Sequence, residues 1–284
     1  MNAPIRAMRR MTPASILALV ALVAYLPSAA GQISECASMV RDIGAPEYKG
    51  NPPQHMILCR IGYVLSHNTE RRTPDWVVEL LTPDRFIGPG DRKQEGDPFA
   101  PDPDLAVGDR AELKDYRKSG FDRGHMAPAA SMKFDIEAMR QSFYLSNMAP
   151  QVGRGLNQHI WADLESLVRD WTCDRGRLVV ITGPIYDDGP SRTIGEGAVA
   201  VPSAFYKIAY DSKAKRALAF ILPNAAVKTK GKPALRSLRA FVATVGEIEE
   251  RSGLDLFAGL APRDERRIEA TKSAIWPVRA GCGQ

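Results

Sequence analysis

The chain has 284 residues, 44% of them hydrophobic and 25% charged, with a formal net charge of +5. This length is enough for one large domain with its own core, and because no linker-like stretch or internal repeat divides the chain, one domain is the simpler interpretation. Three of the positive charges lie in the first thirty residues, so the rest of the chain carries only +2. Net charge alone is therefore weak evidence for a polyanionic partner.

Residues 1–30 are predicted to be a cleaved signal peptide. Three arginines are followed by an apolar run from Ile16 to Tyr25 and by small residues at 28–30, which is the order of a secretory leader. An uncleaved anchor is the alternative, but an apolar run of about ten residues is short against the roughly 20 that a membrane span needs. We expect a mature protein that begins near Gly31, is exported to a periplasm or to the medium, and has no membrane attachment after cleavage.

The remaining residues, 31–284, are predicted to form a single α+β domain. An irregular lead-in covers residues 34–55, and a loop rich in proline and glycine covers residues 83–104, a length at which loops in compact domains are often functional. Residue patterns predict strands at 56–66, 75–81, 177–182, 198–210 and 217–222, and helices at 134–145, 157–171 and 234–251, the last closed by Gly253. Because strands and helices do not alternate strictly, we expect a mostly antiparallel central sheet flanked by helices.

The four cysteines are an even number and remain after removal of the leader, which in an oxidising compartment predicts two disulfides. Of the three possible pairings we favour Cys36 with Cys59 and Cys173 with Cys282, since the second would fasten the C-terminal tail. Metal ligation is the weaker alternative, because the chain has no CxxC pair and zinc ligands are usually closely spaced.

Three short polar strings lie in order between residues 122 and 165, namely DRGH at 122–125, LSN at 145–147 and LNQ at 156–158. Hydrolysis of a phosphodiester needs an activated water, stabilised charge on the phosphoryl oxygens and help for the leaving alkoxide. His125 is the natural base, because imidazole titrates near neutral pH and the small or rigid neighbours of His125 leave room for a nucleic-acid backbone. A lone histidine is ordinarily a packed or surface residue, but the DRGH context favours the base.

Asn157 opens the helix 157–171, where a short polar residue is also expected as a plain N-cap. Glu165 lies about two turns further along an adjoining part of the same face, so an amide oxygen and a carboxylate point the same way. Such oxygen ligands suit a hydrated Mg²⁺ ion. For Glu165 and Arg169 the alternative is an exposed ion pair four residues apart on the helix.

The segments FDRGHMAPAA, FYLSNMAPQ and LNQHIWADLE resemble the signatures of the DNA/RNA non-specific endonucleases. Weaker likeness, in segments such as PDWVVELLT and VVITGPIY, extends the resemblance over residues 56–260. It implies a ββα-metal fold, also called a His-Me finger, with the histidine on a hairpin and the metal-binding asparagine on the following helix.

The resemblance also implies a role for each residue. His125 would be the general base, and Asn157 the single direct protein ligand of Mg²⁺, for which Mn²⁺ is a substitute. Glu165 would hydrogen-bond metal-bound water, and Asn147 would orient the site. The remaining implied roles are neutralisation of the phosphate charge by Arg123 and Arg169, fixing of the local turn by Asp122 and a phosphate contact by Lys207.

The leading expectation is therefore an exported, Mg²⁺-dependent endonuclease that cleaves DNA and RNA with little sequence preference and leaves 5′-phosphate ends; a dimer would fit the family. Nine Lys or Arg residues against Asp211 alone between residues 207 and 240 predict a basic surface for the polyanion, or simply a solvated face. Two other functions stay open, a catalytically inactive nucleic-acid-binding protein on the same scaffold and a phosphodiesterase for small nucleotides.

Overall fold

The computed structural model describes residues 36–92, 98–187, 192–228 and 234–282. The predicted signal peptide and the expected start at Gly31 lie outside these ranges. Along the parts of the chain that are described, none of the helices has the length and apolar composition of a membrane span.

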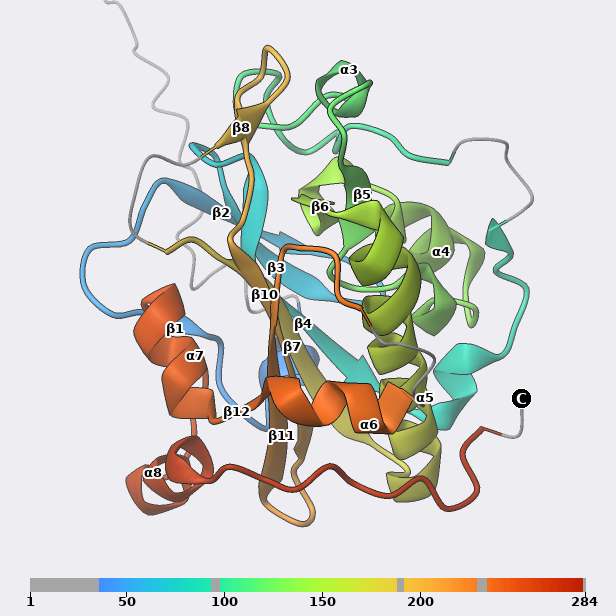
Figure 1. Cartoon of the computed structure of the whole chain (residues 1–284), viewed down its shortest axis with the longest axis vertical. Helices are drawn as coiled ribbons and strands as arrows, with labels where there is room; N and C mark the ends of the chain where they lie inside the picture. Colours follow the sequence, from blue (N-terminus) through green and yellow to red (C-terminus); the bar gives the residue numbers. More distant parts are fainter. Residues whose placement is uncertain (1–35, 93–97, 188–191, 229–233, 283–284) are drawn as a thin grey trace, which may run out of the picture.

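A seven-stranded antiparallel sheet forms the centre of the molecule (Figure 1), which confirms the predicted fold class. Its central strands β7 and β10 are buried at every position because other layers cover both faces. The strands in spatial order are β12 (Val242–Ala243), β11 (Arg216–Pro223), β10 (Ala204–Asp211), β7 (Leu178–Ile185), β4 (Thr73–Leu81), β3 (Val64–Asn68) and β2 (His55–Cys59).

The two faces of the sheet carry two separate apolar cores. Along β10, Phe205 and Ala209 join the core shared with the long helix, whereas Tyr206 and Ile208 join the core on the other face. The first face is covered by the pair β5 (Asp122–His125) and β6 (Met148–Gln151), by α4 (Ile136–Ser142) and by α5 (Ala162–Arg175) with its entry segment η5 (Gly153–Trp161). The second face is covered by α2 (Ala37–Val40), α7 (Val245–Ser252), α8 (Pro262–Ala270) and the pair β1 (Glu47–Tyr48) with β13 (Leu254–Asp255).

The remaining helices and strands are short. They are the 3₁₀ turns η1 (Pro83–Phe86), η3 (Ala129–Ser131), η4 (Leu145–Asn147) and η6 (Arg239–Phe241), the helices α3 (Leu113–Tyr116) and α6 (Ala234–Leu238), and the pair β8 (Thr193–Ile194) with β9 (Val199–Ala200).

Three predicted elements differ from the structure. The strand at 56–66 is the hairpin β2–β3, which turns at 60–63 where Arg60 N donates to Tyr63 O over 2.8 Å. The strand at 198–210 is split into β9 and β10 around Pro202, because proline has no N–H for the sheet. The helix at 234–251 is divided into α6, η6, β12 and α7. The Thr244 hydroxyl accepts from Glu247 N and starts α7, although the predicted C-cap at Gly253 is confirmed.

Both favoured disulfides are present. Cys36 is bonded to Cys59 with Cα atoms 5.7 Å apart, and Cys173 is bonded to Cys282 with Cα atoms 5.4 Å apart. The second bond fastens the C-terminal tail to α5, as expected, and Trp171 Nε1 supports it by donating to Trp276 O over 3.0 Å. Each bond is expected to stabilise the fold by about 2–4 kcal/mol.

The segment between residues 207 and 240 does not present all of its predicted basic side chains to a polyanion. Lys207 is 2% exposed and lies in the core, Lys215 Nζ is 2.6 Å from Asp264 Oδ2, and Lys230 and Lys232 lie outside the residues described. Lys213, Arg216, Lys228, Arg236 and Arg239 are exposed, which fits a surface for a polyanion and a solvated face equally.

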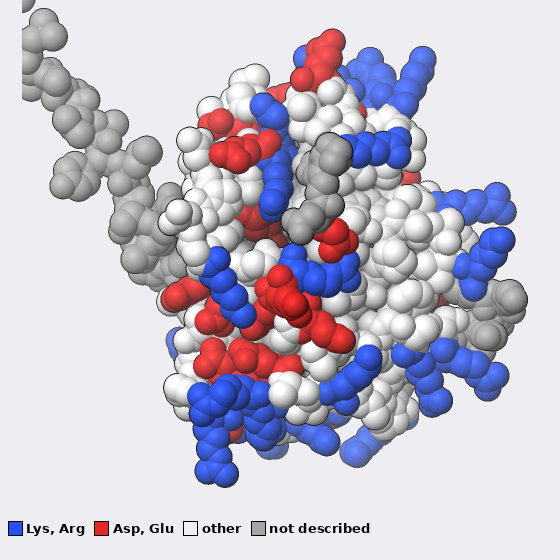
Figure 2. Space-filling model, turned by 60° about the vertical axis from the view of Figure 1, so that its left-hand side comes forward, with Lys and Arg blue, Asp and Glu red and all other residues white. Residues whose placement is uncertain are grey.

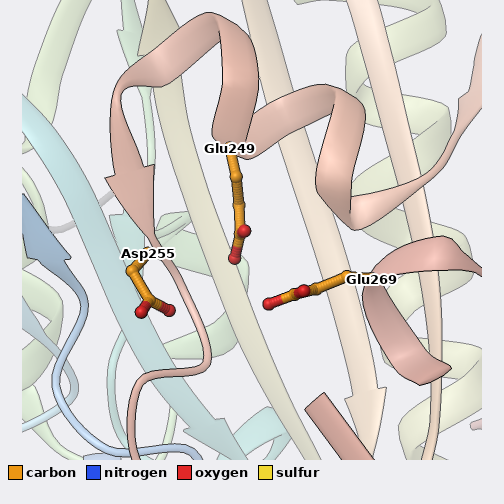
Figure 3. Close-up of side chains that lie close together, drawn as sticks. All are labelled: Glu249, Asp255 and Glu269. Atoms are coloured by element: carbon orange, nitrogen blue, oxygen red, sulfur yellow. The ribbon is translucent and has the colours of Figure 1, made fainter. Parts of the chain in front are cut away.

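The side of the molecule that carries α7, α8 and β1 is instead rich in acidic groups, which gather across the centre of the face in Figure 2. Three carboxylates converge there, those of Glu249, Asp255 and Glu269 (Figure 3), with oxygens within 4.8 Å of one another. Glu249 links α7 to two other segments of the chain. Its Oε1 accepts from Leu256 N and its Oε2 from Lys49 Nζ, both over 2.9 Å.

Candidate active site

The DRGH segment forms strand β5, which pairs with β6 as a short antiparallel ribbon ahead of the long helix. Two glycines allow this close approach. A Cβ on Gly124 would lie 2.2 Å from Gln151 Oε1, and a Cβ on Gly153 would lie 2.7 Å from the Asp122 carboxylate. The ribbon is thereby held against η5, which contains LNQ. The strings DRGH, LSN and LNQ therefore lie next to one another.

A cavity of about 540 Å³ opens between this ribbon and the long helix. It is lined by four of the residues that the sequence singles out, which are His125, Arg123, Asn157 and Glu165. The imidazole of the predicted base and the amide of the predicted metal ligand therefore share one cavity that opens to solvent.

His125 is held between two phenyl rings. Its ring centroid is 5.1 Å from that of Phe143 in an edge-on arrangement and 5.5 Å from that of Phe99. Its Nε2 is enclosed and has no hydrogen-bond partner among the residues that the structure describes. Burial, followed by the charges of Arg92 and Arg123, lowers the pKa of His125 to about 3. The side chain is partly exposed at the cavity, where the neutral imidazole can accept a proton.

Asn157 is oriented by Asp122. Its Nδ2 donates to Asp122 Oδ2 over 2.9 Å, and Gln158 Nε2 donates to the same oxygen over 2.9 Å. A carboxylate only accepts hydrogen bonds, so the amide nitrogen of Asn157 must face Asp122 and its carbonyl oxygen must point away. Asp122 has a structural role, as the sequence predicts, but the group that it fixes is the Asn157 side chain.

The oxygen donors of the cavity fit a hard divalent cation. The Asn157 carbonyl oxygen is turned away from Asp122, and the Glu165 carboxylate lines the same space. Mg²⁺ and similar ions prefer such oxygens to nitrogen or sulfur ligands. Burial raises the pKa of Glu165, whereas Lys207 and Arg169 lower it by charge.

Asn147 is fully buried and does not line the cavity. Its Oδ1 accepts from Ala127 N over 2.9 Å, while its Nδ2 donates to Ala127 O and to Ser142 O, both over 2.8 Å. These bonds fix the chain two residues after His125. The contacts suit the orienting role implied by the resemblance, exerted through the backbone.

The two arginines of the motif differ in position. Arg123 lines the cavity, and its guanidinium carbon lies 3.9 Å from the centroid of the Phe99 ring, which supports it from one side. Arg169 follows Glu165 by one turn of α5 and is not among the lining residues; its Nη1 is buried without a hydrogen-bond partner in the described part of the chain. Arg123 therefore presents positive charge in the cavity, whereas Arg169 acts on it only through its charge, which lowers the pKa of Glu165.

Lys207 does not occupy the place expected for a phosphate contact, and this expectation is corrected. It lies on the central strand β10, where its Nζ donates to Thr182 Oγ1 over 2.6 Å and to Met126 O over 3.3 Å. Burial lowers its pKa, against the opposing charges of Glu165 and Glu79. A lysine enclosed in this way cannot reach a substrate phosphate. It does hydrogen-bond to the backbone of Met126, the residue that follows His125.

Sequence reasoning missed three residues of this region. Arg92 and Lys133 line the cavity. Glu79 is buried, and burial raises its pKa to about 8 against the opposing charge of Lys207. Arg92 lies in the loop at 83–104, and the length of that loop was the one indication that it could contribute to a site. Lys133 lies eight positions after His125, and Glu79 lies within the otherwise apolar part of β4 from residue 76 to 81. Neither residue belongs to a motif.

Comparison with known proteins agrees with this geometry. Residues 41–263 match the family model of the DNA/RNA non-specific endonucleases. Nuclease C1 of Cunninghamella echinulata var. echinulata is 39% identical over 211 residues, which cover 70% of this chain and 82% of that protein. Human mitochondrial endonuclease G is 37% identical over 217 residues, which cover 72% of this chain and 70% of that protein.

A solved structure is similar as well. A crystal structure of the EndoG/EndoGI complex superposes with a TM-score of 0.69 at 29% identity, covering 81% of this chain and 94% of the matched one. The chain therefore belongs to the metal-dependent DNA/RNA non-specific endonucleases and is a nucleic-acid-hydrolysing enzyme with a ββα-metal fold.

Proposed function

We propose that the protein is an exported endonuclease that hydrolyses phosphodiester bonds of DNA and RNA with little sequence preference, using Mg²⁺ or, in its place, Mn²⁺. The observation that carries the proposal is the single cavity that joins a neutral His125, the Asn157 amide, the Glu165 carboxylate and the Arg123 guanidinium. This set offers a proton acceptor, oxygen ligands and positive charge at one point, which phosphodiester hydrolysis requires.

Each group has a task that follows from its surroundings. His125, held neutral by burial, takes the proton of the attacking water. Asn157, with its amide nitrogen fixed by Asp122, presents its oxygen to the cation, while Glu165 orients water in the cavity. When bound, the cation stabilises negative charge on the phosphoryl oxygens and on the leaving 3′ oxygen. Arg123, together with Arg92, stabilises the phosphate from the opposite side.

The charged groups that line the cavity explain why we expect little sequence preference. Its charged lining consists of Arg92, Arg123 and Lys133 against Asp91, Asp122 and Glu165, groups suited to phosphates, cations and one another. Contacts to phosphate carry no base information. A substrate is then recognised by its backbone, which DNA and RNA share.

The test uses the purified mature protein with supercoiled plasmid, single-stranded DNA and RNA, in a series of divalent ions and with a chelator. We expect cleavage of all three in Mg²⁺ and in Mn²⁺, none in chelator, and 5′-phosphate on the products. Binding that persists without cleavage in every metal would support the inactive binder. Cleavage of dinucleotides at the rate seen with long chains would support a phosphodiesterase for small nucleotides.

Export is proposed on the basic, apolar and small-residue segments of residues 1–30. Residues 31–284 would then be the mature single domain in a periplasm or the medium. N-terminal sequencing of the protein recovered from its own host should read from near Gly31. A protein that retains residues 1–30 would contradict the export proposal and leave the nuclease assay unaffected.

A further inference from the structure

A second cavity, of about 510 Å³, adjoins the catalytic one. The two share five lining residues, which are Arg92, Phe99, Asp122, Arg123 and Asn157. The second cavity adds Leu113, Tyr116, Arg117 and Phe121, which come from α3 and from the segment that leads into β5. A chain that passes through the catalytic cavity can continue into this one without leaving the surface.

The outer wall of the second cavity is tied to the neighbouring turn by hydrogen bonds and close packing. Asp115 in α3 is buried, and its carboxylate accepts from Glu112 N over 2.9 Å and from Gly197 N over 2.8 Å. A Cβ on Gly195 or on Gly197 would lie within 2.5 Å of Asp115, so the turn between β8 and β9 is packed directly against α3. Tyr116 is buried beside Ile194 in the same small core.

Two side chains on this wall, Leu113 and Arg117, are exposed to solvent. Leu113 is 38% exposed, and Arg117 is exposed with no ion pair or side-chain hydrogen bond to any residue in the described part of the chain. By contrast, Lys114 on the same helix is paired with Glu196 over 2.9 Å. An apolar and a cationic group therefore lie at the cavity on a helix that is anchored by the buried Asp115.

The charge of the second cavity suits an anion. Arg92, Arg117 and Arg123 face a single acidic residue, Asp122, whose Oδ2 already accepts from Asn157 and Gln158. The volume is in the range of small-ligand sites, roughly 300–1,000 Å³. The lining combines these guanidinium groups with the apolar surfaces of Leu113 and Phe121.

We propose that this second cavity is a subsite for the nucleotide next to the scissile phosphate, an inference that rests on the proposed nuclease function. Arg117 contacts the neighbouring phosphate, and Leu113 and Phe121 pack against the sugar and base of that nucleotide. Apolar packing accepts any base, so the subsite adds affinity for polynucleotides without adding sequence preference. The preferred substrate is accordingly a chain with at least one further nucleotide on this side of the cleaved bond.

Arg117→Gln tests the subsite, with Lys118→Asn as the matched control, since Lys118 carries the same charge one residue away and does not line the cavity. Asparagine is chosen because Lys118 has φ 56°, a conformation that asparagine tolerates. Two substrates are compared, an octanucleotide and bis(p-nitrophenyl) phosphate, which has no neighbouring nucleotide.

For Arg117→Gln we expect kcat/KM on the octanucleotide to fall by roughly tenfold, as for the loss of one charged hydrogen bond. The slope of log affinity against log salt should decrease by about 1. Hydrolysis of bis(p-nitrophenyl) phosphate should be unchanged in Arg117→Gln, and both substrates should be unaffected in Lys118→Asn. Equal losses in the two variants, or an equal loss on both substrates, would overturn the subsite.

A binding measurement separates this inference from the nuclease proposal. Fluorescence anisotropy of a labelled octanucleotide in chelator does not depend on cleavage. Weaker binding by Arg117→Gln than by Lys118→Asn supports the subsite even if the wild-type protein cleaves nothing, an outcome that defeats only the proposed function. Equal binding by both variants, with circular dichroism spectra like that of the wild type, rejects the subsite alone.

Discussion

The side-chain nitrogen of Asn157 lies 2.9 Å from a carboxylate oxygen of Asp122. This contact joins the first residue of DRGH to the asparagine of LNQ, so the ribbon and the helix meet through the group that would hold the cation. The direction of the hydrogen bond fixes which end of the amide faces the cavity. Asp122 is thus a positioning residue for the proposed metal ligand.

Asp122→Ala should weaken cation binding by about 10-fold to 100-fold, as is usual when the partner of a metal ligand is removed. The concentration of Mg²⁺ at half-maximal activity and the Mg²⁺-induced rise in Tm both report the change. Asp122→Asn is the control, because it retains an acceptor oxygen and should fall between Asp122→Ala and the wild type. An unchanged Mg²⁺ requirement in Asp122→Ala would contradict the positioning role.

His125 should remain neutral in the metal-free protein down to low pH, because burial, Arg92 and Arg123 hold its pKa at about 3. A folded pKa below the ordinary 6.5 means that the unfolded chain binds the extra proton, so this group lowers stability as pH falls from about 6.5 to 3. NMR of the imidazole should show no titration between pH 5 and 8, with His125→Gln to assign the signal. A titration midpoint near 6.5 would contradict the burial argument.

Lys207→Met should destabilise the fold by about 1–3 kcal/mol, because it removes the hydrogen bonds from Lys207 Nζ to Thr182 Oγ1 and Met126 O and the charge that opposes the raised pKa of the buried Glu79. The double variant Glu79→Gln/Lys207→Met removes both charges and should recover part of that loss. Urea unfolding of the two variants measures the difference. A double variant less stable than Lys207→Met would show that Glu79 does not depend on Lys207.

The sequence predicted which residues meet at the cavity better than it predicted where helices and strands begin and end. The residues of DRGH and LNQ lie within short segments whose local pairing brings them together, so their order along the chain was informative. The break at Thr244 also had a visible signal, since Thr244 and Glu247 form the S/T-x-x-E pattern of a helix start. The amphipathic pattern on both sides of the break hid it.

The position of Lys207 could not be predicted in the same way. Strand β10 is buried at all of its positions, so the alternation that separates core from surface in a half-exposed strand is missing. Only the long-range pairing of Lys207 with Thr182 across β10 and β7 shows that its ammonium group has a buried acceptor. Arg92 lines the cavity because of the tertiary packing of its loop, and that loop has no periodic residue pattern from which the packing could be predicted.

Glu269 should make the protein less stable as pH rises. Burial, then the charges of Glu249 and Glu265, raises its pKa from the ordinary 4.5 to about 7. The folded state therefore holds a proton that the unfolded state has released, and the stability present below pH 4.5 is lost as pH rises through 7. Glu269→Gln should have a higher Tm than the wild type at pH 8 and a smaller difference at pH 5. A Tm difference independent of pH would count against this reading of the acidic cluster.

The most direct test of the central claim is the cleavage rate of His125→Ala with and without added imidazole. The account predicts a loss of about 10²-fold to 10⁴-fold in the rate on DNA in Mg²⁺, with the circular dichroism spectrum and the Mg²⁺-induced shift in Tm both unchanged. Free imidazole should restore part of the rate, with a pH dependence that follows its neutral form. A variant that cleaves at the wild-type rate while correctly folded would contradict the assignment of His125 as the base and, with it, the proposed chemistry of the cavity.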